Sequence, residues 1–164
     1  MKIVFRIVLL AALAALGIWL WMVLFPSPEK VIRQRLTELA RTGSSSANES
    51  DLARLAAARS VAGFFAANVE LNVNLPELGQ HNMDREEITQ AALMGRSRAG
   101  GLQVKFPDIN ITVAPDKQSA VVDLTVEANI SGEHDSIVQE MKFTLKKTDG
   151  QWFITRVETV RTLN

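Results

Sequence analysis

The stretch "DGQWFITRVE", residues 149–158, decides the fold, because it joins a tight turn to a strand near the end of the chain. Asp149-Gly150 is typical of a two-residue hairpin turn, and the strand-forming residues Trp152 and Ile154 follow it. We expect both side chains to lie in the core. An isolated hairpin is only marginally stable in water, so this strand needs further strands as partners. The sequence before residue 149 is therefore expected to supply a sheet.

The turn at residues 114–118, "APDKQ", is predicted to join two of these strands. If Ala114 lies opposite Ser119, apolar residues face one another along both strands: Val113 and Ala120, Ile111 and Val122, Ile109 and Leu124. The register is well specified, because a slip of one residue would turn every apolar side chain to the other face of the sheet.

The turn at residues 131–136, "SGEHDS", extends the same apolar face to a third strand. Pairing Ser131 with Ser136 sets three apolar pairs opposite one another: Val122 and Leu145, Leu124 and Phe143, Val126 and Met141. The Asp149-Gly150 hairpin then sets Leu145 opposite Ile154. Both turns and the hairpin therefore predict one continuous apolar face.

The opposite face of this sheet is polar. The outward residues of two neighbouring strands are Asp123, Thr125 and Glu127 on one and Lys142, Thr144 and Lys146 on the other. In the predicted register, Lys142 lies diagonally between Asp123 and Glu127. We expect a solvated face with cross-strand ion pairs, each contributing about a few tenths of a kcal/mol. A polar oligomer interface is the alternative.

The strand that precedes the turn at 114–118 changes parity along its length. The apolar residues Leu102, Val104 and Phe106 alternate on one face, whereas Ile109, Ile111 and Val113 alternate on the other. The change falls at Pro107-Asp108. We predict one long strand that is bent by a β-bulge at this point.

A helix is predicted upstream of the sheet, from about residue 50 to 66. Ser46 and Glu49 have the spacing of a capping box, and Ser50 is a second candidate for the N-cap. The predicted apolar stripe of this helix consists of Leu52, Leu55, Ala56, Arg59, Ala62 and Phe65.

A short strand and a second helix follow. The stretch "VELNVNLP", residues 69–76, alternates apolar and polar residues, which predicts a half-buried strand. Asp84 and Glu87 form a second capping-box pattern, and Gly100-Gly101 would end the helix that they begin. Ile88, Ala91, Ala92 and Gly95 are expected to face inward.

This order of elements resembles the nuclear transport factor 2-like superfamily, which includes polyketide-cyclase-like and ketosteroid-isomerase-like proteins. The resemblance covers about residues 50–162 and rests on pattern: the capped helix "DREEI" at 84–88, the long meander and the terminal "DGQWFITRVE" hairpin. Its most specific part is the D-G-x-W-x-I ending. The resemblance implies an α+β fold, a cone-shaped domain of helices packed on a curved antiparallel sheet that can enclose a pocket.

The start of the chain has the composition of a membrane span. Residues from Ile7 to Phe25 carry no charge, and as a helix they would extend about 28 Å, close to the roughly 30 Å of a bilayer's hydrocarbon core. Trp19 and Trp21 lie toward the end of this run, where an aromatic belt is expected. We predict a single N-terminal transmembrane anchor over residues 1–27. A cleaved signal peptide is disfavoured, because no small-residue cleavage site follows the run.

The orientation of the anchor follows from the charges that flank it. Lys2 and Arg6 form a short basic leader, the form of a signal anchor that keeps the N-terminus inside. Four cations follow the run, and by the positive-inside rule they slightly favour the opposite orientation, with the domain inside: Lys30, Arg33, Arg35 and Arg41. We expect an inner-membrane protein with its domain outside the cytoplasm, in the periplasm.

Residues 28–49 are predicted to form an amphipathic stalk helix and a flexible linker between the anchor and a domain at 50–164. Ser27-Pro28 is a helix-start pattern, and the apolar residues at helical spacing are Val31, Ile32, Leu36, Leu39 and Ala40. The helix either continues the membrane helix or packs on the domain. Alternatively, its polar face, with Lys30, Arg33 and Arg41, lies on anionic lipid. The stretch 41–50, "RTGSSSANES", has the composition of a linker, so a chain that starts near Ser46 is expected to be a soluble domain that melts cooperatively.

Composition excludes several chemistries. The chain has 164 residues, a formal net charge of 0, no cysteine and no tyrosine. A neutral balance offers no electrostatic footprint for nucleic acid. Without cysteine there is no thiolate metal site and no catalytic thiol. The isomerase-like members of the superfamily use a carboxylate base with a tyrosine donor, and this chain has no tyrosine for that role.

Few residues remain as candidates for catalysis. Arg156 and Glu158, on the terminal strand, are weak candidates for an acid–base pair, because the sequence does not fix which face of the strand they occupy. His81 and His134 are interpreted as solvated loop residues. No cluster has metal-ligand spacing and no nucleotide-binding or nucleophile motif is present, so we expect no metal and no cofactor.

These observations favour a membrane-anchored, non-catalytic binding or assembly module, an accessory subunit in the bacterial cell envelope. Such a module would contact lipid through residues 7–25, together with other envelope proteins or a second copy of itself. The alternative is a small-molecule enzyme or ligand carrier that uses the cone pocket. Converging polar groups in the cone would favour the alternative, whereas the apolar inner face predicted here favours a filled cone.

Overall fold

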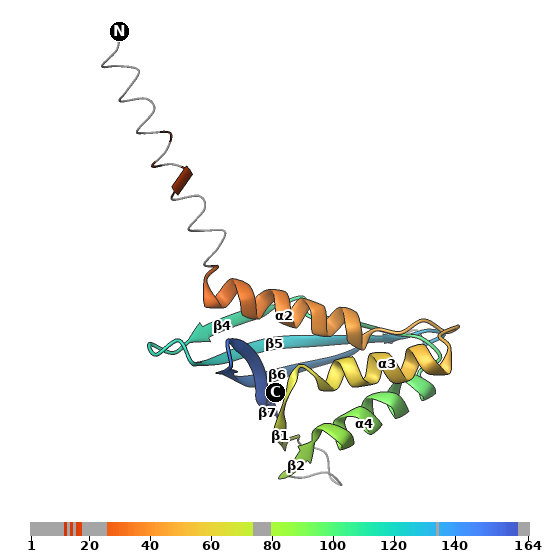
Figure 1. Ribbon diagram of the computed structural model, residues 1–164. Helices are drawn as coiled ribbons and strands as arrows, with labels where there is room; N and C mark the ends of the chain where they lie inside the picture. Colours follow the sequence, from red (N-terminus) through yellow and green to blue (C-terminus); the bar gives the residue numbers. More distant parts are fainter. Residues whose placement is uncertain are drawn as a thin grey trace.

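The computed structural model describes residues 26–73, 80–133 and 135–160, together with residues 12, 14, 16 and 17. Within these residues, helices pack against one side of a strongly curved sheet (Figure 1). The helices are α2 (Pro28–Gly43), α3 (Asp51–Ala62) and α4 (Arg85–Arg98). The strands are β1 (Phe65–Asn72), β2 (Gln80–Asp84), β3 (Leu102–Lys105), β4 (Ile109–Val113), β5 (Ser119–Ile130), β6 (Ile137–Thr148) and β7 (Gln151–Thr159).

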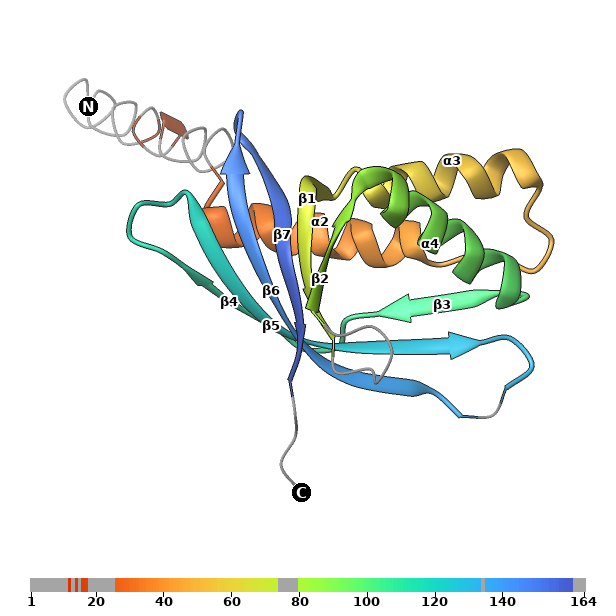
Figure 2. The ribbon, with the colours of Figure 1, turned by 90° about the horizontal axis from the view of Figure 1, so that it is seen from below.

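The seven strands form one sheet in the order β2-β1-β7-β6-β5-β3, and β4 pairs with β5 beside β3. β5 and β6 run the length of the sheet and bend, so that β4 follows one half of β5 and β3 follows the other (Figure 2). β1 pairs with β7 in parallel, whereas the other pairs are antiparallel. The sheet is therefore mixed, which corrects the expectation of an antiparallel sheet. No hairpin joins β1 to β7, so no turn forces them to be antiparallel.

The register predicted around the turn at 114–118 is confirmed, since Ile111 lies opposite Val122 and Val113 opposite Ala120. The predicted register between β5 and β6 is wrong by two residues, since Val122 lies opposite Phe143. The last pair of this ladder is Ala128 with Ile137, and β3 pairs along the other edge of β5, from Glu127 to Ile130. A slip of two leaves every side chain on its predicted face.

Two bulges change the parity of the edge strand and of β7, and a further register shift lies in β1 between Phe65 and Glu70. Lys105 lies opposite Glu127 and Ile109 opposite Leu124, so the edge strand holds one residue more than β5 between these pairs. This confirms the predicted bulge, which divides the expected long strand into β3 and β4. The second bulge lies in β7 at Thr155, whose hydroxyl donates to the carbonyl of Thr144 at 3.1 Å.

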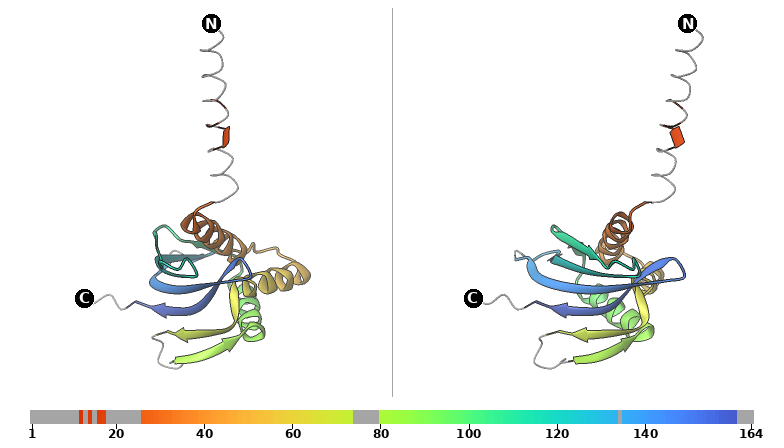
Figure 3. Two further views of the ribbon diagram at one scale, coloured as in Figure 1. Left: turned by 60° about the vertical axis from the view of Figure 1, so that its left-hand side comes forward. Right: turned by 90° about the vertical axis from the view of Figure 1, so that its left-hand side faces the viewer.

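The core lies between the helices and the concave face of the sheet. Trp152 and Ile154 are each 2% exposed, which confirms their predicted place in the core. The buried cluster around them also contains Ile32 and Leu36 of α2, at 0% and 1% exposure. α2 contacts β3 and β4, whereas α4 contacts β1 and β2 at the other end of the sheet (Figure 3).

Of the arrangements expected for the helix in residues 28–49, the structure has the one in which it packs on the domain, whereas the segment after it differs from the expected flexible linker. The apolar face of α2 covers the concave face of the sheet, so the helix is part of the domain core. The following segment is held as well, since Ser45 and Leu102 exchange backbone hydrogen bonds of 2.7 and 3.0 Å. The hydroxyl of Ser44 accepts from the amide of Val104 at 3.0 Å. These contacts are long-range and could not be deduced from the small polar composition of the segment.

The helix starts are partly as predicted. α4 has the predicted capping box, in which Asp84 accepts from the first-turn amides and the Glu87 side chain accepts from the Asp84 amide. α3 begins after Ser50, the second candidate, because the carboxylate of Glu49 is engaged elsewhere. Leu52 is 78% exposed, which corrects the predicted stripe; Ala58 and Ala62 are the buried residues of α3.

Most of the predicted anchor, residues 7–25, lies outside the described residues, as do Leu75 and His134. Within the part of the chain that the structure describes, no helix has both the length and the apolar character needed to cross a bilayer.

Candidate functional site

The two weak catalytic candidates lie on the outer face of the sheet. The bulge at Thr155 reverses the parity of β7, so that Val157 turns toward the core. Arg156 is exposed, and its Nε and Nη2 donate to Glu70 Oε2 at 3.0 and 2.7 Å. Glu158 lies opposite Lys142, which is an outward residue of β6. The structure therefore places both side chains away from the cone.

His81 lies on β2 and not in a loop, which corrects the sequence interpretation. It pairs with Leu71, two residues along β1 from Val69 and therefore on the same face, and Val69 is fully buried. Residues opposite each other in an antiparallel ladder share a face, so His81 is on the inner side of the sheet. A strand as short as "QHNMD" has too little alternation to be recognised from sequence. In the described ranges, no group of three or more His, Asp or Glu side chains is placed to hold a metal.

An acidic hollow of about 590 Å³ lies at the bend of the sheet. Its lining includes Asp108, Asp123 and Glu140. Asp123 is paired with Lys142, which lies directly opposite it at 3.7 Å rather than diagonally as predicted. The polar outer face predicted from the alternation is thus present, with an ion pair between exposed groups.

A larger polar groove of about 720 Å³ separates α2 from α3. We call it the α2–α3 groove. It is lined by Arg35, Glu38, Arg41, Thr42, Ser44, Glu49, Ala57, Ser60, Gly63, Phe64, Arg96 and Gln151. The groove therefore brings together residues from three helices, two loops and the β6–β7 hairpin.

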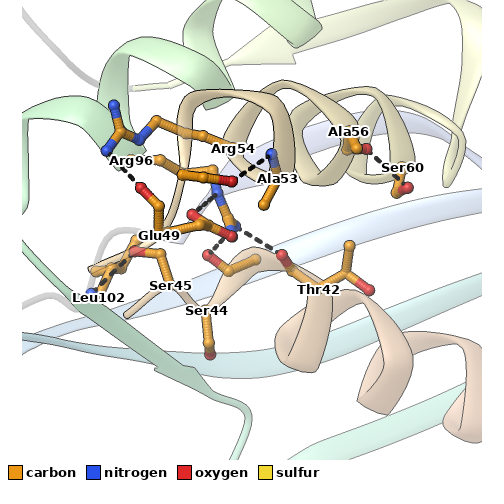
Figure 4. A network of polar contacts seen from close by, with 12 residues as sticks. Thr42, Ser44, Ser45, Glu49, Ala53, Arg54, Ala56, Ser60, Arg96 and Leu102 are labelled. Atoms are coloured by element: carbon orange, nitrogen blue, oxygen red, sulfur yellow. Dashed lines mark hydrogen bonds and ion pairs between the residues drawn. The ribbon is translucent and has the colours of Figure 1, made fainter. Parts of the chain in front are cut away.

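Arg96 lines the groove, and Figure 4 shows its polar contacts. Its side chain is buried, and Nε and Nη2 donate to the two carboxylate oxygens of Glu49 at 3.3 and 2.7 Å. Nη1 donates to the carbonyls of Thr42 and Gly43, at the C-terminal end of α2, at 2.7 and 3.1 Å. Arg96 is thus matched by a carboxylate and also satisfies carbonyls that an α-helix leaves without partners.

Arg35 also lines the groove, but it is not matched in this way. Its guanidinium carbon is 5.1 Å from the centroid of the Phe64 ring and 5.2 Å from that of Phe153. Nη2 donates to the carbonyl of Gly63 at 3.2 Å, whereas Nε is buried without a hydrogen-bond partner. Burial lowers the pKa of Arg35, and no carboxylate among the described residues pairs with it.

Sequence reasoning did not single out either arginine. Arg96 follows Ile88 and Ala92 at intervals of four, so it continues the inward stripe of α4, and a charge on such a stripe indicates a buried partner. Arg35 falls between the buried residues Ile32 and Leu39 on α2. Both signals are visible once the burial of each helix is known, but the partners are far away in sequence.

The comparisons with known proteins concern the fold. No protein-family model and no curated protein sequence matches the chain. Among solved structures, a nuclear transport factor 2-like protein of unknown function from Pseudomonas putida aligns with a TM-score of 0.60 at 11% identity, over 81% of this chain and 85% of its own. The domain has the nuclear transport factor 2-like fold.

Two further structures agree with this nuclear transport factor 2-like assignment. A protein with a cystatin-like fold from Novosphingobium aromaticivorans has a TM-score of 0.59 at 17% identity, over 92% of this chain and 86% of its own. The yeast UBP3-associated protein BRE5 has a TM-score of 0.59 at 14% identity, over 84% of this chain and all of its own. At these identities the likeness concerns the α+β fold alone.

Proposed function

We propose that this chain is a single-pass, membrane-anchored binding and assembly module, an accessory subunit of the cell envelope without catalysis of its own. The observation that carries the proposal is the position of α2. Its N-cap, Ser27, comes two residues after the apolar run ends at Phe25, and the helix is then buried in the domain core. An anchor joined this closely would hold the domain at the membrane surface, where tethering raises the effective concentration of membrane partners.

The character of the inner face supports a role in binding. The buried residues between the helices and the sheet are apolar: Ile32, Leu36, Leu39, Ala62, Val69, Ile88, Ala120, Val122, Leu124, Phe143, Leu145, Trp152, Ile154 and Val157. The best catalytic candidates, Arg156 and Glu158, are on the outer face. Surface features such as the α2–α3 groove are then the places where the module would act.

One observation favours the alternative, a small-molecule enzyme or ligand carrier that uses the cone. His81 is on the inner side of the sheet, and an imidazole there could serve as a proton donor or acceptor. Replacing His81 by Ala separates the two functions. A binding module keeps its role in cells, whereas an enzyme that depends on this imidazole loses it.

The anchor and its orientation are tested with the full-length chain, which has no cysteine of its own. Gln118→Cys introduces one exposed thiol in the turn between β4 and β5. We expect the protein in the membrane fraction and labelling of the thiol by a membrane-impermeant maleimide on cells with a permeabilised outer membrane. Labelling only after lysis would place the domain in the cytoplasm.

The binding role is tested by breaking the apolar run. Leu13→Arg with Leu16→Arg puts two charges into it, each costly in a bilayer, and should release the protein from the membrane fraction and abolish its role in cells. His81→Ala serves as the folded, anchored comparison. If the released protein retained its role, anchoring would be irrelevant and the assembly-module proposal would fail.

A further inference from the structure

We infer that the α2–α3 groove binds an acidic side chain of a protein partner, with the Arg35 guanidinium as the group that pairs with the carboxylate. This inference rests on the proposed binding function and assigns it a surface and a partner chemistry. It differs from any use of the cone, because the groove lies on the helical side of the domain.

The first observation behind this inference is the balance of charges that line the groove. Two arginines are matched inside it: Arg41 pairs with Glu38, and Arg96 pairs with Glu49 at 2.7 Å. Arg35 is the remaining charged residue of the lining, and no carboxylate among the described residues balances it. The groove therefore has a local excess of one positive charge, which one carboxylate would neutralise.

The state of Arg35 carries the second step. Cation–π contacts with the Phe64 and Phe153 rings and the hydrogen bond to the Gly63 carbonyl restrict the guanidinium, so less side-chain entropy is lost when an anion binds. The cation is also partly removed from water, and burial lowers its pKa. A partly desolvated cation gains more from a charge-assisted hydrogen bond than one in bulk water does.

The shape and polarity of the groove carry the third step. Its lining includes Gln151 and Phe64 as well as Arg35 and Arg96. At about 720 Å³ it is much larger than a single carboxylate, and its remaining lining consists of paired charges and small polar groups. A peptide segment with one acidic residue among neutral polar ones fits this pattern better than a free anion, which would leave most of the groove filled only by water.

The first test follows the arginine side chains directly. The full-length chain, labelled with ¹⁵N-arginine in detergent micelles, is titrated with the blocked pentapeptide Gly-Ser-Glu-Ser-Gly and with its Gln counterpart. We expect a saturable shift of the Arg35 side-chain resonances with the Glu peptide alone. Arg98, which is exposed on α4, should not shift in a saturable way. No saturable shift, or equal shifts with both peptides, would overturn the inference.

Free anions provide the second arm of this test. Acetate and inorganic phosphate are titrated against the same resonances. The expected result is weaker saturation than with the Glu peptide, by about tenfold or more, because the anions lack contacts with the rest of the groove. If either anion bound as tightly as the peptide, the site would take a small anion and the assignment of a protein partner would be wrong.

A pair of matched variants tests the position of the ligand. Ser60 lines the groove near the end of α3, and Ser97 lies near the end of α4 outside it; both are exposed and donate to the carbonyl four residues earlier, at 2.9 and 2.8 Å. Ser60→Glu supplies a tethered carboxylate, so it should weaken binding of the Glu peptide by about tenfold or more and melt at a higher temperature than Ser97→Glu. Equal effects of the two variants would contradict the assignment.

Arg35→Gln and Arg35→Lys complete the design. The Gln variant should weaken binding of the Glu peptide by about tenfold. The Lys variant should be intermediate, because it retains the charge without the planar fork. For these variants binding is followed by anisotropy of a labelled Glu peptide. Unchanged affinity in Arg35→Gln would overturn the inference, whereas Ser60→Glu tests it without altering Arg35.

Failure of this inference can be separated from failure of the proposed function. If the Glu peptide does not bind, but breaking the apolar run with Leu13→Arg and Leu16→Arg still abolishes the cellular role, the groove assignment is wrong and the anchored module stands. If the peptide binds through Arg35, but releasing the protein from the membrane has no effect, the groove stands and the anchored module is wrong.

Discussion

Arg96 and Arg35 line the same groove, yet their surroundings give them opposite roles. Arg96 has both oxygens of Glu49 and two helix-end carbonyls as acceptors, so its charge is balanced within the fold. Arg35 has two aromatic rings, one carbonyl and a buried Nε without an acceptor. The comparison teaches that a charged side chain with all its partners in its own chain stabilises the fold. A charged side chain that lacks such a partner in an accessible groove is available to another protein.

Removing α2, which carries Arg35 and supplies the carbonyls that Arg96 binds, should have the largest effect on stability. A chain that begins at Ser46 lacks α2, and with it Ile32, Leu36 and the carbonyls that Arg96 binds. Truncating one buried Leu or Ile to Ala costs about 2–5 kcal/mol. Loss of the whole helix therefore approaches the total stability of a domain, about 5–15 kcal/mol. We expect no cooperative melting by circular dichroism.

The control for this truncation begins at Ser27 and keeps the N-cap of α2. It should melt cooperatively. The sequence alone predicts that the shorter chain, starting at Ser46, is a soluble domain, and the burial of α2 predicts the opposite. A folded Ser46 chain would return α2 to the status of a stalk.

Breaking the balanced pair should have the next largest effect. Arg96→Met leaves the Glu49 carboxylate buried without a cation, which typically costs about 3–5 kcal/mol. Arg98 is exposed and lies two residues after Arg96 on α4, so Arg98→Met should change the free energy of unfolding by less than about 0.5 kcal/mol. Urea unfolding of the full-length chain in micelles measures both. Equal, small effects would mean that Glu49 is less buried than its 15% side-chain exposure indicates.

Removing both partners should restore part of this loss. In Arg96→Met with Glu49→Met no buried charge is left, and only the carbonyls of Thr42 and Gly43 lose their donors. The double variant is expected to lie about 1–2 kcal/mol below the unmodified chain, the range for unsatisfied polar groups. If the double variant were as unstable as Arg96→Met, the helix-end carbonyls rather than the ion pair would dominate.

Arg35→Met should have the smallest effect on stability. It removes cation–π contacts of about 0.5–2 kcal/mol, but it also removes a partly desolvated charge with an unsatisfied Nε. We expect a net change below about 1 kcal/mol in the same unfolding measurement. A loss as large as that of Arg96→Met would erase the contrast between the two arginines and make Arg35 a structural residue.

The parts of the fold that could be predicted are those specified by neighbouring residues. The Asp149-Gly150 turn has positive φ at both residues, 50° and 79°, as its sequence implies, and alternation then placed Trp152 and Ile154 in the core. The slip of two residues between β5 and β6 could not be detected, because a period of two is unchanged by it. The bulge at Thr155 also left no sequence signal, so the faces of Arg156 and Glu158 could not be assigned.

The groove could not be predicted, because its pairs are remote in sequence. Arg96 meets Glu49 across 47 positions, and Arg35 meets Phe153 through the packing of α2 on the sheet. Amphipathicity showed that α2 has an apolar face but not what covers it. The small polar residues 44–50 resembled a linker, since their hydrogen bonds to β3 depend on tertiary structure.

The short connection at Pro26-Ser27-Pro28 has a mechanical consequence. Two prolines with restricted φ flank the N-cap of α2, and α2 itself is fastened to the sheet along its length by buried side chains and by the bond from Arg33 to the carbonyl of Ile109, 3.0 Å long. No flexible linker lies between Pro26 and α2, so a pull or a twist that arrives through the chain before Pro26 is transmitted to this helix. The buried side chains of α2 then pass the force to the concave face of the sheet.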